Sequence, residues 1–261
     1  MLAHLPLILL AHATLAPPST PPEPAAPEVT DGDAQGNTGD IVVTARRRAE
    51  TEQTVPIALS VLSGRTLADS GAFNVNRLQQ QVPTLQFYSS NPRNSAINIR
   101  GLGAPFGLTN DGIEQGVGFY IDGVYIGRVG ASTFDFVDVD RVEVLRGPQG
   151  TLYGKNTTAG ALNITTRAPS FTPEARAELS VGNYDFVQGK TSISGPITDT
   201  LAIRLSTSAT TRHGTIYDVA SNTDLHRQRN IGFRGQVLYK PTDTLSLTLA
   251  GDLNVQNPLC C

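Results

Sequence analysis

A glycine-rich loop at residues 147–160 is where this sequence comes nearest to a phosphate-binding pattern. Such a loop needs G-x-x-x-x-G-K-[ST], because its backbone N–H groups surround the phosphates and its lysine reaches them. Gly154 and Lys155 supply the second half, but Gln149 occupies the place of the first glycine and Asn156 that of the serine or threonine. The two G-x-G pairs elsewhere lack the third glycine of a dinucleotide fingerprint. Nucleotide chemistry is therefore not predicted.

Histidine is the other residue type that could carry chemistry, and the chain has four. His213 and His226 bracket a polar stretch and could touch a metal complex, although solvated loop histidines are the simpler interpretation. The cysteines, Cys260 and Cys261, are adjacent and do not form a metal-binding pattern by themselves. No Ser-His-Asp set or carboxylate pair is apparent, so we predict a protein that is not an enzyme, with no catalytic residue, cofactor or metal site.

Three charged residues, Arg100, Glu143 and Arg146, lie in stretches that are otherwise apolar or rich in glycine. They are either surface charges and locally satisfied pairs, or charges that meet opposite charges on another part of the protein. In the second case water is excluded, and the loss of one partner is costly. Both interpretations are open from the residues alone.

The composition limits which elements can carry these residues. The chain has 261 residues and a net charge of −3, which allows one large or two modest domains and gives no basic footprint for nucleic acid. No apolar run reaches the roughly 18 residues of a membrane-spanning helix. The 25 glycines and 17 prolines favour short strands and turns.

The first 45 residues change character twice. Residues 1–16 are apolar and end in small residues, with Ala11 and Ala13 fitting an A-x-A cleavage site, which predicts a signal peptide. Residues 17–39 are rich in Pro and Ala and predict a disordered tether. Residues 40–45, Asp-Ile-Val-Val-Thr-Ala, are β-prone. This hexamer is either an edge strand of the next domain or a strand that adds to another protein's sheet, and we expect it to be loosely attached.

Residues 46–169 mix short strands with short helices, which predicts an α+β domain. Val75, Leu78 and Val82 recur at helical spacing before Pro83. The Asp-Gly pair in Tyr-Ile-Asp-Gly-Val-Tyr, residues 120–125, predicts a hairpin with a type I′ turn. Further strands are expected at residues 56–62, 97–99, 141–145 and 161–166.

Residues 170–261 alternate apolar and polar side chains. In residues 201–210, Leu and Ile alternate with Ala, Arg and Ser, and residues 177–182, 231–239 and 245–254 behave alike. Pro-Ile-Thr-Asp-Thr-Leu at 196–201 returns as Pro-Thr-Asp-Thr-Leu at 241–245, with a longer polar connection between them. This pattern predicts strands of a transmembrane β-barrel, although a soluble sandwich alternates too.

Several motifs resemble those of TonB-dependent outer-membrane receptors. Residues 40–45 resemble a TonB box, and Val-Pro-Ile-Ala-Leu-Ser-Val at 55–61 resembles the first strand of the plug domain. Three further segments resemble the central motifs of that plug domain. They are Ile-Arg-Gly at 99–101, residues 116–125, and Arg-Val-Glu-Val-Leu-Arg-Gly-Pro-Gln-Gly-Thr-Leu-Tyr-Gly at 141–154. Residues 160–167 resemble its exit strand. The resemblance runs from about residue 40 to the end of the chain.

The resemblance implies an α+β plug domain of mixed short strands and helices (46–169), followed by the first strands of an antiparallel transmembrane β-barrel. In this family the barrel has about 22 strands and lies in the cell outer membrane, with the plug facing the periplasm. The implied activity is energy-coupled uptake of a scarce solute. A ferric siderophore is expected ahead of cobalamin, glycans or aromatic compounds.

The implied partners are TonB, with ExbB and ExbD behind it, outer-membrane lipid and the transported ligand, but no nucleic acid. The implied TonB-binding strand is Asp40, Ile41, Val42, Val43, Thr44 and Ala45. The implied contacts between plug and barrel are Arg100, Glu143 and Arg146, meeting carboxylates on the barrel wall.

Residues 170–261 suffice for about five strands of the usual membrane-spanning length. About five strands do not close a barrel, and an open sheet edge is not tolerated in lipid. We therefore expect a truncated receptor that does not transport alone, the product of a frameshift, a premature stop or a partial sequence. The alternative is a plug-bearing periplasmic binding module whose β tail packs as a soluble sheet. A signal-transducing receptor would carry an extra folded domain, for which residues 17–39 are too short.

Overall fold

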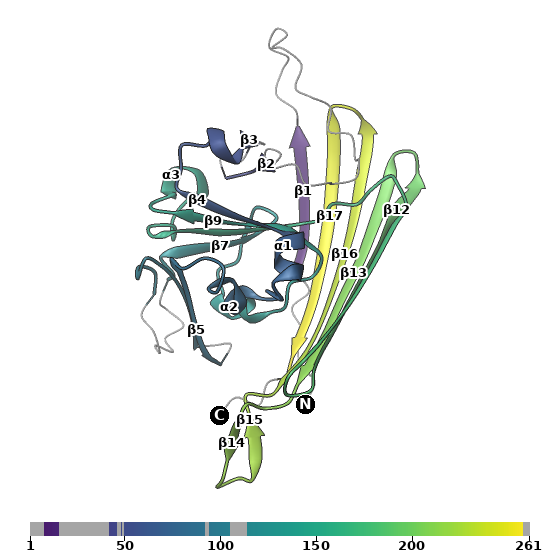
Figure 1. Cartoon of the computed structure of the whole chain (residues 1–261). Helices are drawn as coiled ribbons and strands as arrows, with labels where there is room; N and C mark the ends of the chain where they lie inside the picture. The colour runs from purple at the N-terminus through teal and green to yellow at the C-terminus, as the bar shows by residue number, and fades with distance from the viewer. Residues whose placement is uncertain are drawn as a thin grey trace.

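The computed structural model describes residues 8–15, 42–45, 48, 50–91, 94–104 and 114–257. The predicted tether, the first two residues of the predicted TonB box, and both cysteines lie outside the described residues. In the described part of the chain, no helix is both long and apolar enough to cross a membrane. Two larger sheets organise the structure (Figure 1). One lies in residues 46–169, for which we keep the name plug domain from the resemblance above, and the other is formed mainly by the C-terminal strands.

The plug domain is built on a five-stranded sheet in the order β4-β9-β10-β7-β8. Strand β10 runs parallel to β7, and the other neighbouring pairs are antiparallel. The bounds are Leu59–Ser63 (β4), Val117–Ile121 (β7), Val124–Tyr125 (β8), Val139–Arg146 (β9) and Gly160–Thr166 (β10). These strands confirm those expected at residues 56–62, 141–145 and 161–166, although β4 begins at Leu59 rather than at residue 56. The strand expected at 97–99 lies in a separate hairpin, described below.

The turn between β7 and β8 is the predicted type I′ hairpin. Asp122 has φ 49° and Gly123 has φ 78°, so both central residues adopt the positive φ that this turn requires. The carboxylate of Asp122 accepts hydrogen bonds from the backbone N–H (2.8 Å) and the hydroxyl (2.7 Å) of Thr166. The turn is thereby tied to the end of β10.

Short helices and a second hairpin complete the plug domain. Helix α1 (Gly64–Asp69) was not predicted; Ser63 caps it by accepting from the Thr66 N–H at 3.1 Å. The expected helix near Val75 is α2 (Val75–Leu78), capped by Asn74. The remaining elements are β2 (Val42–Val43), β3 (Glu50–Thr51), the 3₁₀ turns Glu52–Thr54 and Val129–Thr133, β5 (Leu85–Asn91), β6 (Asn94–Ile99) and α3 (Gly150–Tyr153).

The apolar core of the plug domain fills the space between this sheet, the helices and the β5–β6 hairpin. Val75, Leu78 and Val82 are all buried in it. The helix ends at Leu78, however, so the predicted helix up to Pro83 is confirmed only for its first turn. Other buried members include Leu85, Ile97, Ile99, Val117, Val142, Val144, Leu162 and Ile164.

The C-terminal residues form a long antiparallel sheet in the order β17-β16-β13-β12-β11. Its strands are β11 (Glu174–Gly182), β12 (Phe186–Thr198), β13 (Leu201–Arg212), β16 (Gln228–Thr242) and β17 (Leu245–Gln256). The two predicted tight turns join β12 to β13 and β16 to β17. The longer connection between β13 and β16 holds a small hairpin, β14 (Ile216–Asp218) and β15 (Thr223–Leu225).

This long sheet has the reverse polarity of a water-soluble one. The face toward the plug domain buries polar side chains, among them Gln188, Ser192, Arg204, Ser206, Thr210 and Gln236. The other face exposes apolar side chains, among them Leu179, Val181, Ile193, Ile231, Phe233, Leu249 and Val255. Apolar-out and polar-in alternation is what a lipid-facing strand with a polar interior requires.

One further strand lies at the edge of the long sheet. Strand β1 (Ile8–Leu15) pairs antiparallel with β17, so that Ile8 lies opposite Asp252 and Leu15 opposite Leu245. These residues belong to the predicted signal peptide, which stays a prediction. The pairing shows that the edge of β17 accepts another strand, as unpaired sheet edges do.

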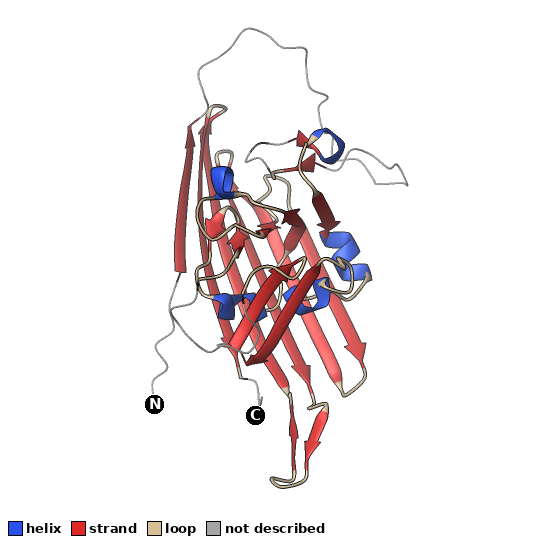
Figure 2. Cartoon of the chain, turned by 90° about the vertical axis from the view of Figure 1, so that its left-hand side faces the viewer, coloured by secondary structure: helices blue, strands red, loops and turns tan. Residues whose placement is uncertain are grey.

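The plug domain lies against one face of the long sheet (Figures 1 and 2). The β14–β15 hairpin extends beyond one end of the sheet, whereas β2 and β3 lie toward the opposite end (Figure 1). We call the first the hairpin end and the second the β2 end.

Candidate functional site

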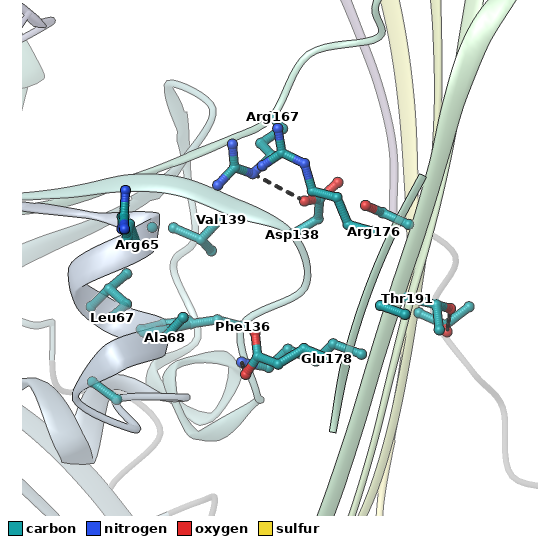
Figure 3. A pocket seen from close by; sticks show the side chains of 16 residues that line it. Arg65, Leu67, Ala68, Phe136, Asp138, Val139, Arg167, Arg176, Glu178 and Thr191 are labelled. Carbon is teal, nitrogen blue, oxygen red and sulfur yellow. Dashed lines mark hydrogen bonds and ion pairs between the residues drawn. The ribbon is translucent and has the colours of Figure 1, made fainter. Parts of the chain in front are cut away.

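Two arginines of the long sheet reach into the plug domain, and the first is Arg204 of β13. Its side chain is only 3% exposed. Nη1 lies 2.9 Å from Oδ2 of Asp138, and Nε donates to the carbonyl oxygen of Ala168 at 2.8 Å. Ser206, two residues along the same face, also donates to Asp138 at 2.9 Å. Asp138 is further paired with Arg167, 3.3 Å away (Figure 3). It therefore links two guanidinium groups.

The second arginine is Arg234 of β16, which is 2% exposed. Its guanidinium pairs with Asp122 in the β7–β8 turn of the plug domain and, at 2.6 Å, with Asp252 of β17. Gln236 on the same face donates to the hydroxyl of Thr166 at 3.0 Å. The turn that the Asp-Gly pair forms is therefore also one of the points where the plug domain binds this sheet.

A buried carboxylate, Asp135, extends this polar interface toward the hairpin end. Its Oδ1 accepts from Nδ2 of Asn230 on β16 at 3.1 Å. Burial raises the pKa of Asp135 above its ordinary value, and hydrogen bonds from Thr210 and Asn230 act against that shift. Thr133 and Gln256 of β17 add two hydrogen bonds, of 2.9 Å and 2.8 Å.

A cavity of about 440 Å³ lies between α1 and strands β11 and β12 (Figure 3). On the plug side it is lined by Leu67, Ala68 and Phe136. On the sheet side it is lined by residues such as Glu178 and Thr191. The plug domain thus contacts β13 and β16 through ion pairs but leaves space beside β11 and β12.

A smaller cavity, of about 190 Å³, lies at the hairpin end between the plug domain and the ends of β13, β16 and β17. Arg77 of α2, Arg212 of β13, and the neighbours His226 and Arg227 line it, together with Phe73 and Phe87. The guanidinium of Arg77 stands 5.7 Å from the centre of the Phe73 ring. Aromatic rings and several cations around one cavity suit an anionic ligand that carries flat or apolar groups. His213, by contrast, lies 2.9 Å from Asp185 and is largely exposed.

The described part of the predicted TonB box, residues 42–45, packs against the plug domain at the β2 end. Val42 and Val43 pair with Thr51 and Glu50 of β3. Val43 and Ala45 are 0% exposed and join a cluster with Val55, Tyr120, Leu145, Tyr153 and Ala161. The expectation of a loosely attached segment is therefore wrong for residues 42–45. Of the two interpretations from the sequence, the edge strand of the next domain is the arrangement that the structure has.

Glu143 lies beneath this segment, and its side chain is 0% exposed. Its Oε1 accepts from the N–H of Thr44 at 2.7 Å, from the Thr44 hydroxyl at 3.1 Å and from Nε of Arg141 at 3.0 Å. Its Oε2 accepts from Nδ2 of Asn163 at 3.2 Å. A carboxylate that is enclosed and bonded inside the plug domain is not available to a barrel wall. The predicted plug–barrel contact at Glu143 is therefore wrong, and the alternative of a locally satisfied group is confirmed.

Arg146 and Arg100 have different surroundings. Arg146 donates from Nη2 to the carbonyl oxygen of Leu59 at 2.8 Å, which ties β9 to β4. Arg100 is exposed, with φ 54°, in the turn after β6. Within the described residues no hydrogen bond or ion pair joins either side chain to the long sheet. Contacts of these two residues with a barrel wall remain predictions.

Sequence reasoning missed the carboxylates and arginines that do join the two parts. The missed residues are Asp122, Asp135, Asp138, Arg204 and Arg234. The usable signal was the placement of an arginine on the face opposite Leu201, Ile203 and Leu205, because a charge among small polar residues marks the interior of a barrel. The glycine-rich loop holds α3, and Lys155 pairs there with Glu114 at 2.5 Å on the surface.

The comparisons with known proteins agree with this geometry. Residues 51–161 match the family model described as the TonB-dependent receptor plug domain. The pesticin receptor of Yersinia pestis is 34% identical over 171 residues, which cover 64% of this chain and 24% of that protein. The catecholate siderophore receptor Fiu of Escherichia coli K12 is 30% identical over 183 residues, covering 68% of this chain and 22% of that protein.

A solved structure has a similar fold over most of this chain. The ferric yersiniabactin uptake receptor FyuA from Yersinia pestis superposes with a TM-score of 0.65 at 31% identity, covering 72% of this chain and 29% of that one. The chain spans about a quarter of the length of the curated relatives it matches.

Proposed function

We propose, for a chain that belongs to the TonB-dependent outer-membrane receptors, that its plug and strands serve energy-coupled uptake of a ferric siderophore. The observation that carries the proposal is the polarity of the long sheet. Its buried face holds Arg204 and Arg234 against plug carboxylates, and its other face is apolar. Members of this family are receptors and transporters rather than enzymes.

Coupling to TonB would use residues 40–45 as an added strand. Val42, Val43 and Thr44 supply the β-branched side chains that strand pairing favours. The described part of the segment lies at the end of the molecule opposite the β14–β15 hairpin (Figure 1). A ligand entering at the hairpin end and TonB acting at the β2 end would thus meet opposite ends of one plug.

The cavity at the hairpin end supports the proposed ligand class. The cavity brings Arg77, Arg212 and Arg227 together with His226. An anionic ferric chelate with aromatic groups would neutralise these cations and contact the partly exposed ring of Phe87. Two of the relatives are named for such uptake: a catecholate siderophore receptor and a ferric yersiniabactin uptake receptor.

The experiment that tests the proposal is capture of the C-terminal domain of TonB by an immobilised peptide of residues 40–45. We expect capture by the native peptide and strongly reduced capture by the same peptide with Val43→Pro, because proline removes a ladder N–H. A Val43→Ala peptide, which keeps that N–H, is the matched control. Equal capture by the proline and native peptides would show that these residues do not bind TonB as a strand.

A periplasmic binding module remains the competing proposal, and the long sheet distinguishes the two. A soluble module would cover the apolar face of that sheet or make it polar. Leu179, Val181 and Ile193 are instead well exposed on this face. This exposure favours the receptor, and the solubility experiment in the Discussion decides between them.

A further inference from the structure

Phe186 joins the long sheet to the plug domain through a contact between two aromatic rings. It is the first residue of β12, and its ring stacks on that of Phe73 with the ring centres 5.3 Å apart and the planes inclined by 28°. Aromatic pairs at separations of about 4.5–7 Å attract each other beyond the effect of burial alone. Phe73 is only 5% exposed, whereas Phe186 is half-buried. A ring of the sheet therefore covers a ring of the plug domain.

The turn that carries Phe186 has an unusual backbone. Between Asn183 and Phe186 both central residues have positive φ, 61° at Tyr184 and 51° at Asp185. Residues other than glycine rarely adopt this conformation, and it persists only where surrounding contacts stabilise it. His213, directly after β13, supplies two such contacts. Its N–H donates to the carbonyl oxygen of Tyr184 at 2.8 Å, and its Nδ1 lies 2.9 Å from Oδ2 of Asp185. The start of β12, and with it Phe186, is thereby held in place.

Phe73 in turn lies beside Arg77 of α2. The carbonyl oxygen of Phe73 accepts from the N–H of Phe136 at 2.7 Å. The next residue, Asn74, caps α2 by accepting from the N–H of Arg77 at 3.2 Å. The guanidinium of Arg77 stands 5.7 Å from the centre of the Phe73 ring, close enough for the attraction between a cation and an aromatic face. Because the Phe73 ring is enclosed, it supports Arg77 rather than offering a surface to a ligand.

Arg77 needs this support because of its neighbours in the cavity at the hairpin end. Arg212 and Arg227 line the same cavity, and among the described residues around it none carries a carboxylate. Like charges repel, so an unsupported Arg77 would turn away toward water. An arginine side chain also has many rotamers, and holding it in one orientation before a ligand arrives reduces the entropy that binding costs.

We propose that Phe186 is a positioning residue for this cavity, which fixes Phe73 and through it orients Arg77 toward an anionic ligand. Phe186 is not among the residues that line the cavity, so it acts without touching the ligand. The inference rests on the proposed function for its ligand. The orientation of Arg77 itself rests on the two ring contacts and is tested separately.

The first test is equilibrium dialysis of the whole chain in detergent micelles against an anionic ferric catecholate and a neutral ferric hydroxamate. From the usual strength of an aromatic pair, we expect Phe186→Leu to weaken binding of the anion about two- to tenfold and to leave the neutral chelate unchanged. Phe186→Tyr keeps the ring and should bind as the native chain does. Phe233→Leu, on the exposed apolar face of β16, is the matched control. Unchanged binding of the anion by Phe186→Leu, or equal weakening for both chelates, would overturn the positioning role.

A double-mutant cycle decides whether Phe186 acts through Arg77. If it does, Phe186→Leu should add little to the loss of affinity that Arg77→Gln causes, because the side chain that it positions is already gone. Fully additive losses would mean that Phe186 affects the cavity by another route, and they would overturn the proposal.

Hydrogen–deuterium exchange without a ligand separates the positioning role from the choice of ligand. Phe186→Leu should speed exchange of the Arg77 amide about two- to tenfold, because the bond of this amide to Asn74 depends on the fixed position of Phe73. Phe186→Tyr should restore the native rate, and β16 and β17 should stay protected in both variants. Unchanged exchange at Arg77 in Phe186→Leu, or equal loss of protection in β16 and β17, would overturn the inference. If the native chain binds neither chelate while exchange responds as expected, the proposed ligand class is wrong and the positioning of Arg77 stands.

Discussion

Arg204 and Asp138 are 66 positions apart in the sequence, yet Nη1 of the arginine lies 2.9 Å from Oδ2 of the carboxylate. The arginine belongs to the long sheet and the carboxylate to the plug domain. Arg167 and Ser206 share the same carboxylate, so one buried aspartate connects both parts of the chain. A pair of this kind, shielded from water, specifies how the two parts dock. Removal of either charged side chain destabilises the docked arrangement, because the other charge stays buried with fewer partners.

Removing one partner of this pair should be costly. We expect Arg204→Ala to lower the free energy of unfolding by about 3–5 kcal/mol, since it leaves Asp138 short of a partner in a buried site. Urea denaturation of the chain in detergent micelles, followed by circular dichroism, measures the change. Arg176→Ala on β11 of the same sheet is the control, because that arginine is half exposed and its pair with Glu174 should contribute about 0–1 kcal/mol. Equal losses in the two variants would contradict a docking role for Arg204.

The pKa of Asp135 predicts a pH dependence of docking. Burial raises this pKa above its ordinary value of 3.8, so the folded chain binds the proton more tightly than the unfolded chain. The resulting stabilisation is complete below that ordinary value and is lost as pH rises through the raised pKa. Asp135→Asn resembles the protonated form, and its stability relative to the native chain should therefore increase from about pH 4 to about pH 7. Thermal unfolding midpoints across this range measure the difference. Asp199→Asn in an exposed turn is the control, and a difference that stays constant with pH would exclude Asp135 as the titrating group.

The strands could be predicted because their signal is local. In residues 201–210 each apolar residue is followed by a small or polar one, and the structure places the first set outward and the second against the plug domain. The hairpin at Asp122 and Gly123 could be predicted for the same reason, since its turn depends on two adjacent residues. Helix α1 was missed because Leu67 is its one buried residue, which gives no helical period.

The partners across the interface could not be predicted from local patterns. The approach of Arg234 to Asp122 depends on the register of β16 and on where the plug domain docks, and those residues are 112 positions apart. The burial of Val43 and Ala45 was missed for a related reason. A β-branched segment has the same sequence whether it pairs with its own domain or with another protein. The choice depends on contacts distant in the sequence, such as that of the Thr44 N–H with Glu143, 99 positions away.

The cavity at the hairpin end predicts selectivity for charge. We expect Arg212→Gln and Arg77→Gln each to weaken binding of an anionic ferric catecholate by about tenfold, because each removes one charge-assisted contact. A neutral ferric hydroxamate should be affected much less. Equilibrium dialysis of the chain in detergent against both chelates measures this, with Arg65→Gln on the exposed side of α1 as the control. Equal weakening for both chelates would indicate loss of shape rather than of charge recognition.

The exposed apolar face of the long sheet predicts how the chain behaves in water. Leu205, Leu247 and Leu249 point away from the plug domain, and an apolar stripe of this kind favours aggregation unless lipid or detergent covers it. We therefore expect the 261-residue chain to need detergent. A chain ending at Ser170 should be monomeric without it, because the plug surface that it uncovers carries Asp122 and Asp138, which are readily solvated.

Size-exclusion chromatography of the two proteins, with and without detergent, measures the difference. A third protein, the full chain with Leu205, Leu247 and Leu249 replaced by threonine, is the control. It should recover solubility if the apolar stripe is the cause, since threonine keeps the strand preference while removing apolar surface. The binding-module alternative predicts the reverse order, because its β tail would complete a soluble core. A monomeric full chain in detergent-free buffer, together with aggregation of the chain ending at Ser170, would therefore reject the receptor proposal in favour of that module.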